Sequence, residues 1–359
     1  MSSSSPQIVI VGAGLIGLST ADSLLSRGAR VTLIDARKGP ARGTSFANSG
    51  MIHPSQVRPW ASDRDVSDAA VTALYDLAVR SRRQIGLRMN ALGLTDALRR
   101  PRGCYQIFDD ARSCEMTRQT LVTDGISVNR VETDPLFDRP TLFYPDDRSA
   151  DAREYGVRLS EDLVARGATL IFDAVQTRLF RDEAGHPQIA LGHHVFDTDA
   201  IVICAGAQSE TVLSSLDISC PVKPVRGWAA DFAWTNEALR SAWPSTPVMD
   251  APSRSAFTPF VDRFRLSGTW GQESASPLLK RWFQLAPDNM RQAGRPLAIW
   301  SGLRPVSPLG RPFIGRTRFE NLFVNTGHGH LGWTLCAGSG ELLADILYDK
   351  LSAPEFALQ

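Results

Sequence analysis

The first 35 residues restrict the possible folds more than any other part of the chain. Residues 7–11 predict a strand, because their Ile-Val-Ile-Val run is typical of a strand buried on both faces of a parallel sheet. Residues 12–17 form a glycine-rich turn, a helical pattern continues to about Arg27, and a second strand over 30–34 ends at Asp35. Glycine-rich turns alone are common, but strand, turn, helix, strand and acid in this order predict a β-α-β unit that binds a dinucleotide.

Each glycine of the turn has a separate mechanical role. Gly12 makes the tight turn, Gly14 lets the backbone approach a pyrophosphate, and Gly17 lets the helix pack closely on the strand. The helix also presents its N–H groups and the positive end of its dipole to the phosphates. The Asp35 carboxylate accepts a hydrogen bond from a ribose 2′-OH and repels a 2′-phosphate, which argues against NADP. We predict nucleotide contacts from Gly12, Ala13, Gly14, Leu15, Ile16, Gly17, Asp35, Ala36 and Arg37.

The segment that follows favours FAD over NAD. Residues 43–54 are mostly small or hydroxyl-bearing, which suits a backbone that lies along an extended ligand and donates hydrogen bonds to it. An NAD-binding fold normally continues into another β-α unit at this point. The alternative is a plain polar loop. The FAD contacts predicted here are Thr44, Ser45, Asn48, Gly50 and Met51.

Motifs at both ends of the chain carry a family resemblance. The glycine-rich turn is joined by Thr-Ser-Phe-Ala-Asn-Ser-Gly at 44–50, and the far end contains Gly-Leu-Arg-Pro at 302–305 and Gly-Arg-Pro-Phe-Ile-Gly at 310–315. A further run, Asn-Thr-Gly-His-Gly-His-Leu-Gly-Trp-Thr, occupies 325–334. With these motifs the sequence resembles the FAD-dependent D-amino-acid oxidase superfamily, and most of all the bacterial D-amino-acid dehydrogenases.

This resemblance implies a fold and a division of the chain. The expected class is α/β, with a Rossmann-like FAD domain of the glutathione-reductase type and an inserted α+β substrate domain on a mainly antiparallel sheet. The FAD domain is expected to be discontinuous, over 1–58, 146–220 and 301–359. The substrate domain is expected to comprise 59–145 and 221–300.

The middle of the chain is compatible with that division. We expect helices over 69–92 and 151–167, the latter with Leu159, Leu163 and Val164 on one face, and strands over 169–172 and 199–204. The resemblance implies a backbone contact from Val175 to adenine and a close approach of Ala205 and Gly206 to the flavin diphosphate. Without the resemblance, both turns are equally well explained as sheet interior.

Aromatic-rich strands are expected over 222–232, 255–261 and 264–269. They suggest the roof of a substrate pocket, although large aromatic side chains are more often buried for packing. The candidates for the pocket lining are Trp228, Phe232, Phe257 and Trp270.

The C-terminal motifs supply the remaining cofactor contacts and the first catalytic candidate. The resemblance implies flavin contacts from Gly302, Gly329, His330, Leu331, Gly332 and Thr334. A helix beginning near Leu331 would direct its N terminus at the pyrimidine edge of the flavin, where negative charge develops on reduction. The resemblance assigns Arg304 to the substrate carboxylate, which a planar guanidinium binds through two hydrogen bonds. A structural salt bridge is the alternative role for Arg304.

Histidines supply the other catalytic candidates, His53 and His330. His53 is expected to face the isoalloxazine ring, to steer substrate or, as a lesser alternative, to carry a covalent flavin link; otherwise it satisfies a local carbonyl. Of His328 and His330, one is expected to face the pocket and the other to pack. Neither has a carboxylate or cysteine at ligand spacing, so no metal site is expected.

The resemblance implies that the reaction is the oxidative deamination of a D-amino acid. Hydride passes from Cα to flavin N5, and the imino acid is hydrolysed to a 2-oxo acid and ammonia. A dehydrogenase is favoured, and its electron acceptor, quinone or oxygen, stays open; an oxidase that uses oxygen and acts on glycine, proline, hydroxyproline or an N-methyl amino acid is the alternative. An NAD(P)H-linked flavin reductase or hydroxylase lacks its second nucleotide motif or redox cysteines here, and a non-catalytic flavin-binding scaffold stays open.

Composition limits partners and location. Lys and Arg number 39 against 38 Asp and Glu, which gives no electrostatic footprint for nucleic acid. The five cysteines are scattered and never spaced as C-x-x-C, which fits a reducing compartment. No run of apolar residues is long enough for a membrane helix, and residues 1–6 do not resemble a signal peptide. A cytoplasmic enzyme with at most peripheral membrane association is expected, and the oligomeric state stays open.

Overall fold

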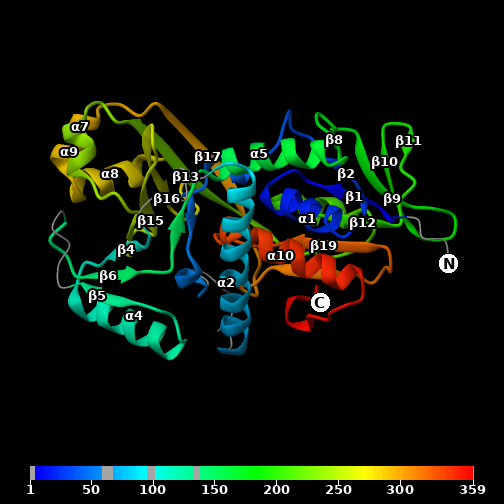
Figure 1. Ribbon diagram of the computed structural model, residues 1–359, viewed down its shortest axis with the longest axis horizontal. Coiled ribbons are helices and arrows are strands. Elements are labelled where there is room, and N and C mark those ends of the chain that lie inside the picture. The colour runs from blue at the N-terminus through cyan, green and yellow to red at the C-terminus, as the bar shows by residue number, and fades with distance from the viewer. Residues whose placement is uncertain (1–4, 59–67, 95–101, 132–136, 359) are drawn as a thin grey trace.

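Two sheets organise the chain, as the computed structural model shows (Figure 1). The structure describes residues 5–58, 68–94, 102–131 and 137–358. One half of the molecule holds a six-stranded sheet with both chain ends nearby, and the other half holds an eight-stranded sheet. The long helix α2 (Asp68–Ala91) runs between the two halves.

The six-stranded sheet is parallel except at one edge. Its strands, in spatial order, are β18 (Phe313–Arg316), β19 (Leu322–Thr326), β12 (Ala200–Ile203), β1 (Gln7–Val11), β2 (Arg30–Ile34) and β8 (Thr169–Ile171). Only β18 runs antiparallel to its neighbour. Strands far apart in sequence therefore meet in one sheet, and the carboxyl ends of β1, β2 and β12 lie at the same edge.

Both faces of this sheet are covered, which explains the apolar run in β1. Ile8 and Ile10 pack beneath helices α1 (Leu15–Leu25), α5 (Ala152–Ala165) and α10 (Gly332–Leu347). Val9 faces the other side, toward α6 (Ser209–Ser214) and a three-stranded sheet of β9 (Thr177–Arg181), β10 (Pro187–Leu191) and β11 (His194–Val195). A strand with apolar neighbours on both faces cannot alternate with polar residues.

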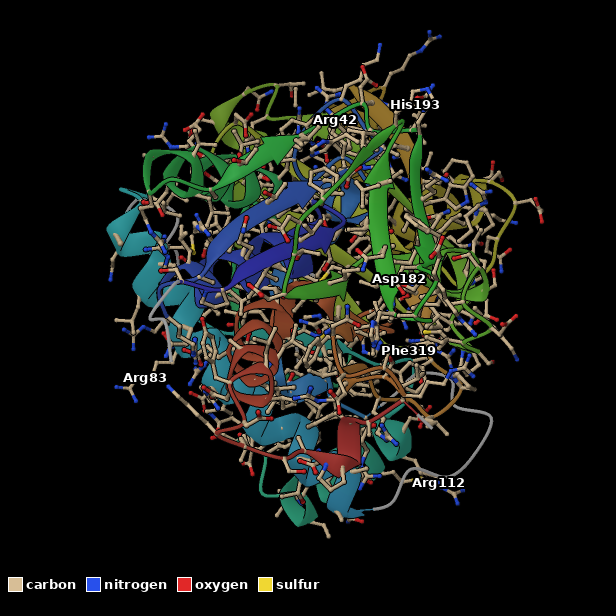
Figure 2. All side chains as sticks on the ribbon, turned by 90° about the vertical axis from the view of Figure 1, so that its right-hand side faces the viewer. Arg42, Arg83, Arg112, Asp182, His193 and Phe319 are labelled. Atoms are coloured by element: carbon tan, nitrogen blue, oxygen red, sulfur yellow. The ribbon has the colours of Figure 1, made fainter. Side chains whose placement is uncertain are left out.

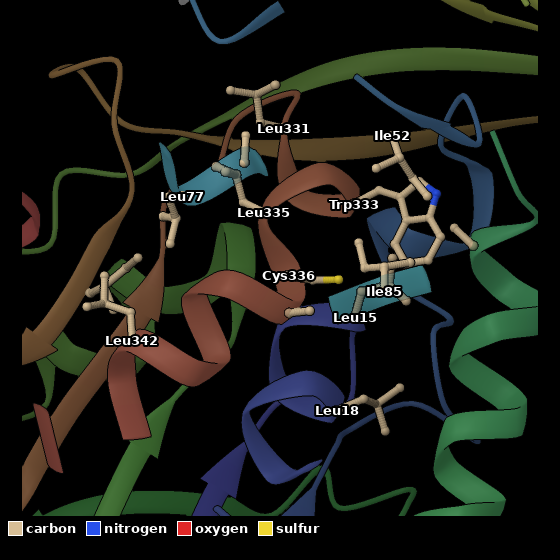
Figure 3. Close-up of a cluster of buried hydrophobic side chains, with 14 of the residues drawn as sticks. Leu15, Leu18, Ile52, Leu77, Ile85, Leu331, Trp333, Leu335, Cys336 and Leu342 are labelled. Carbon is tan, nitrogen blue, oxygen red and sulfur yellow. The ribbon is translucent and has the colours of Figure 1, made fainter. Parts of the chain in front are cut away.

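Helix α10 is the centre of the helical layer, in contact with both α1 and α2 (Figure 3). Leu15 and Leu18 of α1, Leu335 and Cys336 of α10, and Ile85 of α2 belong to one buried cluster. Glycines allow the close approach: an ideal Cβ on Gly338 would lie 2.7 Å from the Leu77 carbonyl oxygen of α2, and one on Gly340 would lie 2.7 Å from the Ser19 carbonyl oxygen of α1.

A pair of glycine substitutions tests this packing. We expect Gly338→Ala to lower the free energy of unfolding by about 1–3 kcal/mol, because backbone must move to admit the methyl group. Gly86→Ala, in α2 with no atom within 4 Å of an added Cβ, is the matched control and should raise it by roughly 0.5–1 kcal/mol through helix propensity. Chemical denaturation of both variants measures the difference. Equal effects of the two substitutions would contradict the close helix approach.

The eight-stranded sheet is mainly antiparallel. Its strands, in spatial order, are β17 (Ala298–Val306), β13 (Lys223–Ala233), β16 (Arg263–Gly268), β15 (Ser255–Pro259), β14 (Val248–Asp250), β4 (Cys104–Ile107), β6 (Thr141–Tyr144) and β5 (Asn129–Val131). Only β14 and β4 pair in parallel. Helices α7 (Glu237–Ala242), α8 (Ser276–Leu285) and α9 (Pro287–Ala293) contribute to the apolar core of this half. Helix α4 (Ala111–Thr123) packs beside β6.

Short elements join the two halves. A two-stranded sheet is formed by β3 (Met51–Ile52) and β7 (Arg148–Ser149). Single 3-10 turns occupy Thr44–Ala47, Pro54–Gln56, Gly206–Gln208 and Pro354–Phe356.

The predicted α/β class, with a Rossmann-like sheet and a second, mainly antiparallel sheet, is confirmed. Of the residues expected on the apolar face of the helix at 151–167, Leu159 and Leu163 are buried, but Val164 is 53% exposed, so its placement was wrong. The predicted division into domains stays a prediction; β17 runs through its boundary at 300 and 301 and pairs with β13.

Charged side chains lie mainly on the outside (Figure 2), where Arg83 and Arg112 project from the surface. Among the described helices, none combines the length and the hydropathy needed to cross a membrane.

Candidate active site

One large cavity connects the two halves of the molecule, with a volume of about 1200 Å³. Gly12, Asp35 and Val175 line one end of it, and His53 and Arg304 line the other. Single small-molecule sites usually measure about 300–1000 Å³. The cavity is therefore large enough for a dinucleotide together with a small substrate.

The nucleotide end is formed where β1 meets α1. Gly12 has a φ of +112°, and an ideal Cβ there would lie 2.4 Å from the carbonyl oxygen of Cys204 on the next strand segment. A Cβ on Gly17 would lie 1.8 Å from the Gly12 carbonyl oxygen. Larger residues at either position are incompatible with this turn, so the two glycines are required by the close packing of strand and helix.

The N terminus of α1 opens onto the cavity. Gly14 is its N-cap and offers no side-chain acceptor, and both Gly14 and Leu15 line the cavity, so the positive end of the helix dipole faces it. Asp35 is held beside this end, since its carboxylate accepts hydrogen bonds from the backbone N–H of Ala13 and of Arg37, each at 2.7 Å. This geometry fits a pyrophosphate at the helix and a ribose at Asp35.

The segment at 44–51 is fixed along the middle of the cavity. Thr44 donates its hydroxyl hydrogen to the Leu303 carbonyl oxygen at 2.6 Å, and Arg265 donates to the Asn48 carbonyl oxygen at 2.9 Å. Trp333 of α10 donates to the Gly50 carbonyl oxygen at 3.3 Å. Three elements thus hold the backbone of this segment in place, and the plain-loop alternative does not account for that.

Most of the predicted cofactor contacts line the cavity. These are Gly12, Gly14, Leu15, Ile16, Asp35, Ala36, Arg37, Thr44, Ser45, Asn48, Met51, Val175, Ala205, Gly206, Gly302, Gly329, His330 and Gly332. Ala13, Gly17, Gly50, Leu331 and Thr334 lie outside the lining and support it. Thr334, for example, accepts a hydrogen bond from the His53 backbone N–H at 3.1 Å. These residues fit FAD, because they provide a phosphate-binding turn at Gly12, a ribose acceptor at Asp35 and an extended backbone segment at 44–51.

Arg304, on β17, is the main cation at the other end. Its guanidinium donates to the carbonyl oxygens of Thr269 at 2.8 Å and Gly268 at 3.2 Å, and lies 5.6 Å from the centre of the Trp270 ring. Within the described residues no carboxylate pairs with it, so the salt-bridge alternative has no partner there. Burial lowers the pKa of Arg304 to about 10, which still leaves it charged at neutral pH.

Gly227 makes room for this side chain. On the neighbouring strand β13, an ideal Cβ at Gly227 would lie 2.3 Å from a terminal nitrogen of Arg304. The guanidinium therefore passes over a position without a side chain to reach the cavity. An uncompensated, positioned cation of this kind is suited to bind a carboxylate.

His53 and His330 lie close together, with ring centroids 6.0 Å apart, and both line the cavity. His53 is buried, its Nδ1 has no partner among the described residues, and burial lowers its pKa to about 4. The His330 Nε2 lies 3.1 Å from the Gln56 carbonyl oxygen and therefore carries the hydrogen. Burial, with the nearby His53 and Arg304, lowers the pKa of His330 to about 3. Both rings are neutral at pH 7.

His328 lines the cavity as well as His330, and the expectation that one ring faces the pocket while the other packs stays a prediction. Neither ring nitrogen of His328 has a partner in the described part of the chain, and burial lowers its pKa to about 3. The described residues contain no group of three or more metal-ligating side chains.

The four aromatic candidates for the pocket lining lie in different surroundings. Trp228 lines the cavity, whereas Phe232 and Phe257 are fully buried in the core of the second half. Trp270 lies against Arg304 outside the large cavity.

Sequence reasoning missed several lining residues, because they share no motif and come from separate segments that only the tertiary structure brings together. They include Gln56, Arg58, Gln106, Thr117, Met249, Arg254 and Ser267. They have no common sequence signal: Gln106 and Met249 lie inside strands, Gln56 lies in a 3-10 turn and Thr117 lies on helix α4.

Comparisons with known proteins agree with this geometry. Residues 7–346 match the family described as FAD dependent oxidoreductase. A D-amino acid dehydrogenase of Neisseria gonorrhoeae is 30% identical over an alignment of 404 positions, which covers 96% of each chain. Glycine oxidase from Geobacillus kaustophilus has a similar structure, with a TM-score of 0.82 at 22% identity over 99% of both chains. L-proline dehydrogenase from P. horikoshii has a TM-score of 0.77 at 16% identity, over 98% of this chain and 96% of that one.

The family match spans both halves of the nucleotide site and nearly the whole chain, and the cavity provides the cradle, ribose acceptor and backbone edge that the cofactor needs. The chain therefore belongs to the family of FAD-dependent oxidoreductases.

Proposed function

We propose that the protein oxidises D-amino acids and passes the electrons to a quinone. The observation that carries the proposal is Arg304, a charged guanidinium without a carboxylate partner in the described chain, at the opposite end of a cavity from the nucleotide cradle. The D-amino acid dehydrogenase relatives, similar over 96% of the chain, support the amino acid as substrate and its stereochemistry.

Arg304 would hold the substrate carboxylate through two hydrogen bonds and so fix the direction of the Cα–H bond. When bound, FAD supplies the acceptor for the hydride that leaves Cα. The product is an imino acid, which water hydrolyses to a 2-oxo acid and ammonia. His53 and His330 are neutral and weakly basic, so the substrate amine must lose its proton before or during binding.

The low pKa values of the two histidines also predict which group controls the rate. Because both rings stay neutral above about pH 5, the rise of kcat/KM with pH should follow the substrate amine and not a histidine. A substrate series with different amine pKa values would then shift the profile by the same amounts.

An anaerobic substrate panel tests the proposal. The purified protein should be yellow, and D-amino acids should bleach its flavin absorbance while their L-enantiomers do not. Slow reoxidation on admission of oxygen, and fast reoxidation by a soluble quinone, would support the dehydrogenase. Fast reoxidation by oxygen would favour an oxidase. Reduction by glycine, proline or N-methyl amino acids only, or by NADH, would overturn the D-amino acid assignment, and the absence of any reduction would favour a scaffold.

We also propose a cytoplasmic location. All five cysteines are buried and free, which suits a reducing compartment. The relation of the enzyme to a membrane quinone pool is tested by fractionation: peripheral association should be released by high salt.

A further inference from the structure

A second arginine, Arg254, lines the same cavity as Arg304. It lies in the turn between β14 and β15 and has a left-handed backbone conformation, with a φ of +51°. The residue is exposed, and no carboxylate within the described part of the chain pairs with it. A non-glycine residue held in this conformation is a costly arrangement that tends to occur where a side chain has a task.

The turn that carries Arg254 is held by a buried polar network. The carboxylate of Asp250 accepts two hydrogen bonds from Arg281, at 2.7 Å each, and one from the Ser253 backbone N–H at 3.3 Å. The Ser255 hydroxyl lies 2.6 Å from that of Ser253 and accepts from Trp282 Nε1 at 3.0 Å. The backbone at Arg254 is therefore fixed before any ligand binds. The same contacts direct the charge of Asp250 toward Arg281.

Gly268 links this turn to Arg304. Its carbonyl oxygen accepts a hydrogen bond from Arg304 at 3.2 Å. An ideal Cβ on Gly268 would lie 2.5 Å from the Ser255 Cα and 2.6 Å from the Arg254 carbonyl oxygen, so the backbone of the turn contacts Gly268 directly. Gly268 therefore contacts both arginines: it accepts a hydrogen bond from the Arg304 guanidinium and packs against the backbone of Arg254, although the two arginines are far apart in sequence.

The net charge is positive at the end of the cavity that Arg304 lines. Arg58 also lines the cavity, but it forms a two-point ion pair with Asp124, at 2.5 Å. Asp250 is paired with Arg281 as described, and Asp35 lies at the nucleotide end. Burial is the main reason for the low pKa of His330, and the charges of both Arg304 and Arg254 add to it. Both cations therefore act on His330, which lines the cavity.

An unpaired hydroxyl lies between the two arginines in the sheet. Ser267, on β16, pairs with Ala256 of β15 on one side and with Ala229 of β13 on the other. It is 4% exposed, lines the cavity, and its Oγ has no hydrogen-bond partner among the described residues. A buried hydroxyl without a partner costs free energy that a ligand oxygen can recover.

We propose that Arg254, with Ser267 Oγ, forms a second anion subsite that binds the side-chain carboxylate of an acidic D-amino acid. The inference rests on the proposed function, in which Arg304 binds the α-carboxylate. It narrows the substrate class to D-amino acids with a second carboxylate, such as D-glutamate or D-aspartate.

Matched substrates test the subsite in the holoenzyme. D-Glutamate and D-glutamine have nearly the same shape and differ in charge, so the ratio of their kcat/KM values isolates the second carboxylate. We expect a ratio of about ten or more, carried by KM and reduced at high salt, since one partner of the ion pair is exposed. A ratio near one in the unmodified enzyme, or one insensitive to salt, would overturn the proposal.

Substitutions assign the effect to Arg254. Arg254→Gln should bring the D-glutamate to D-glutamine ratio close to one, and Arg254→Glu should invert the preference toward D-lysine. Ser267→Ala should lower the ratio by a smaller factor. Arg295→Gln removes the same charge from an exposed arginine outside the cavity lining and should keep the ratio. A ratio that survives Arg254→Gln, or that falls equally in Arg295→Gln, would overturn the proposal.

A binding measurement separates this inference from the proposed function. Calorimetry compares glutarate with pentanoate, which lacks the second carboxylate, and requires no turnover. Stronger binding of glutarate that disappears in Arg254→Gln supports the subsite even if no D-amino acid reduces the flavin, in which case only the proposed function fails. If neutral D-amino acids are oxidised while glutarate and pentanoate bind alike, the subsite is wrong and the proposed function stands.

Discussion

Replacing Arg304 with glutamine should lower kcat/KM for D-amino acids by about a hundred- to a thousandfold while FAD stays bound. Removing one partner of a buried charge pair costs roughly 2–5 kcal/mol, and the expected loss lies within the corresponding range of about thirtyfold to a few thousandfold. The nucleotide cradle lies at the far end of the cavity, so the substitution leaves its contacts in place. Anaerobic reduction of the flavin measures the loss, and its visible spectrum and FAD content report on the cofactor.

Three further variants separate binding of the carboxylate from general damage. Gly227→Ala should weaken substrate binding without removing the charge, because the added Cβ would occupy the space of the guanidinium. Arg304→Lys should recover part of the activity, since it keeps the charge but loses the two-point geometry. Arg226→Gln, on the adjacent residue of β13 and outside the cavity lining, is the control. If Arg226→Gln is as harmful as Arg304→Gln, or if Arg304→Gln retains full activity, the role of Arg304 is wrong.

The free energy of unfolding should rise by about 1.4–2.7 kcal/mol per pH unit between pH 4 and 6.5. Burial lowers the pKa of His53 to about 4 and of His328 and His330 to about 3, so their stabilisation is present above pH 6.5 and is lost as pH falls. Asp147 acts in the opposite direction: burial raises its pKa to about 7, so its stabilisation is present below pH 4 and is lost as pH rises toward 7.

The slope follows from the protons that the two states bind in this range. The unfolded chain binds up to three more protons at the histidines, and the folded chain binds one more at Asp147, which leaves a net difference of two. All three histidines border the cavity, where water shields part of their effect, so the difference lies between one and two. Denaturant unfolding at a series of pH values measures it.

Two variants identify the groups responsible for this slope. Asp147→Asn removes the opposing carboxyl and should increase the slope of the free energy of unfolding against pH by the equivalent of about one bound proton. His328→Gln should decrease the same slope by the equivalent of about one bound proton. A slope that neither variant changes would show that other groups control the acid stability.

Sequence reasoning succeeded where the signal is local. The order of strand, turn, helix, strand and acid in residues 7–35 requires Gly12, Gly17 and Asp35 at fixed spacing, and each has the predicted position. Arg304 was singled out from its motif and lines the cavity, while its role stays a prediction. Helix ends and strand limits were predicted to within a few residues, because capping and burial on both faces are properties of short segments.

Side-chain direction was harder to predict. Val164 belongs to the apolar pattern of its helix but is exposed, because the buried stripe is narrower than the pattern suggests. His328 and His330 flank a glycine with a φ of +57°, and both residues line the cavity. Phe232 and Phe257 have the same strand context as Trp228 but face the core formed with α8 and α9.

The sequence by itself determined the nucleotide fold, the FAD cradle and the arginine expected to hold a carboxylate, because the residues involved are neighbours along the chain or part of one motif. Only the tertiary structure decided which charged residues line the cavity without an ion-pair partner in the described chain. Ser267 and Arg304 come from two strands of the second sheet and Arg254 from a turn between two others, and Gly268 contacts both arginines. Whether a cation is neutralised depends on contacts across the fold, such as those of Arg58 with Asp124 and Arg281 with Asp250, and no local pattern encodes them.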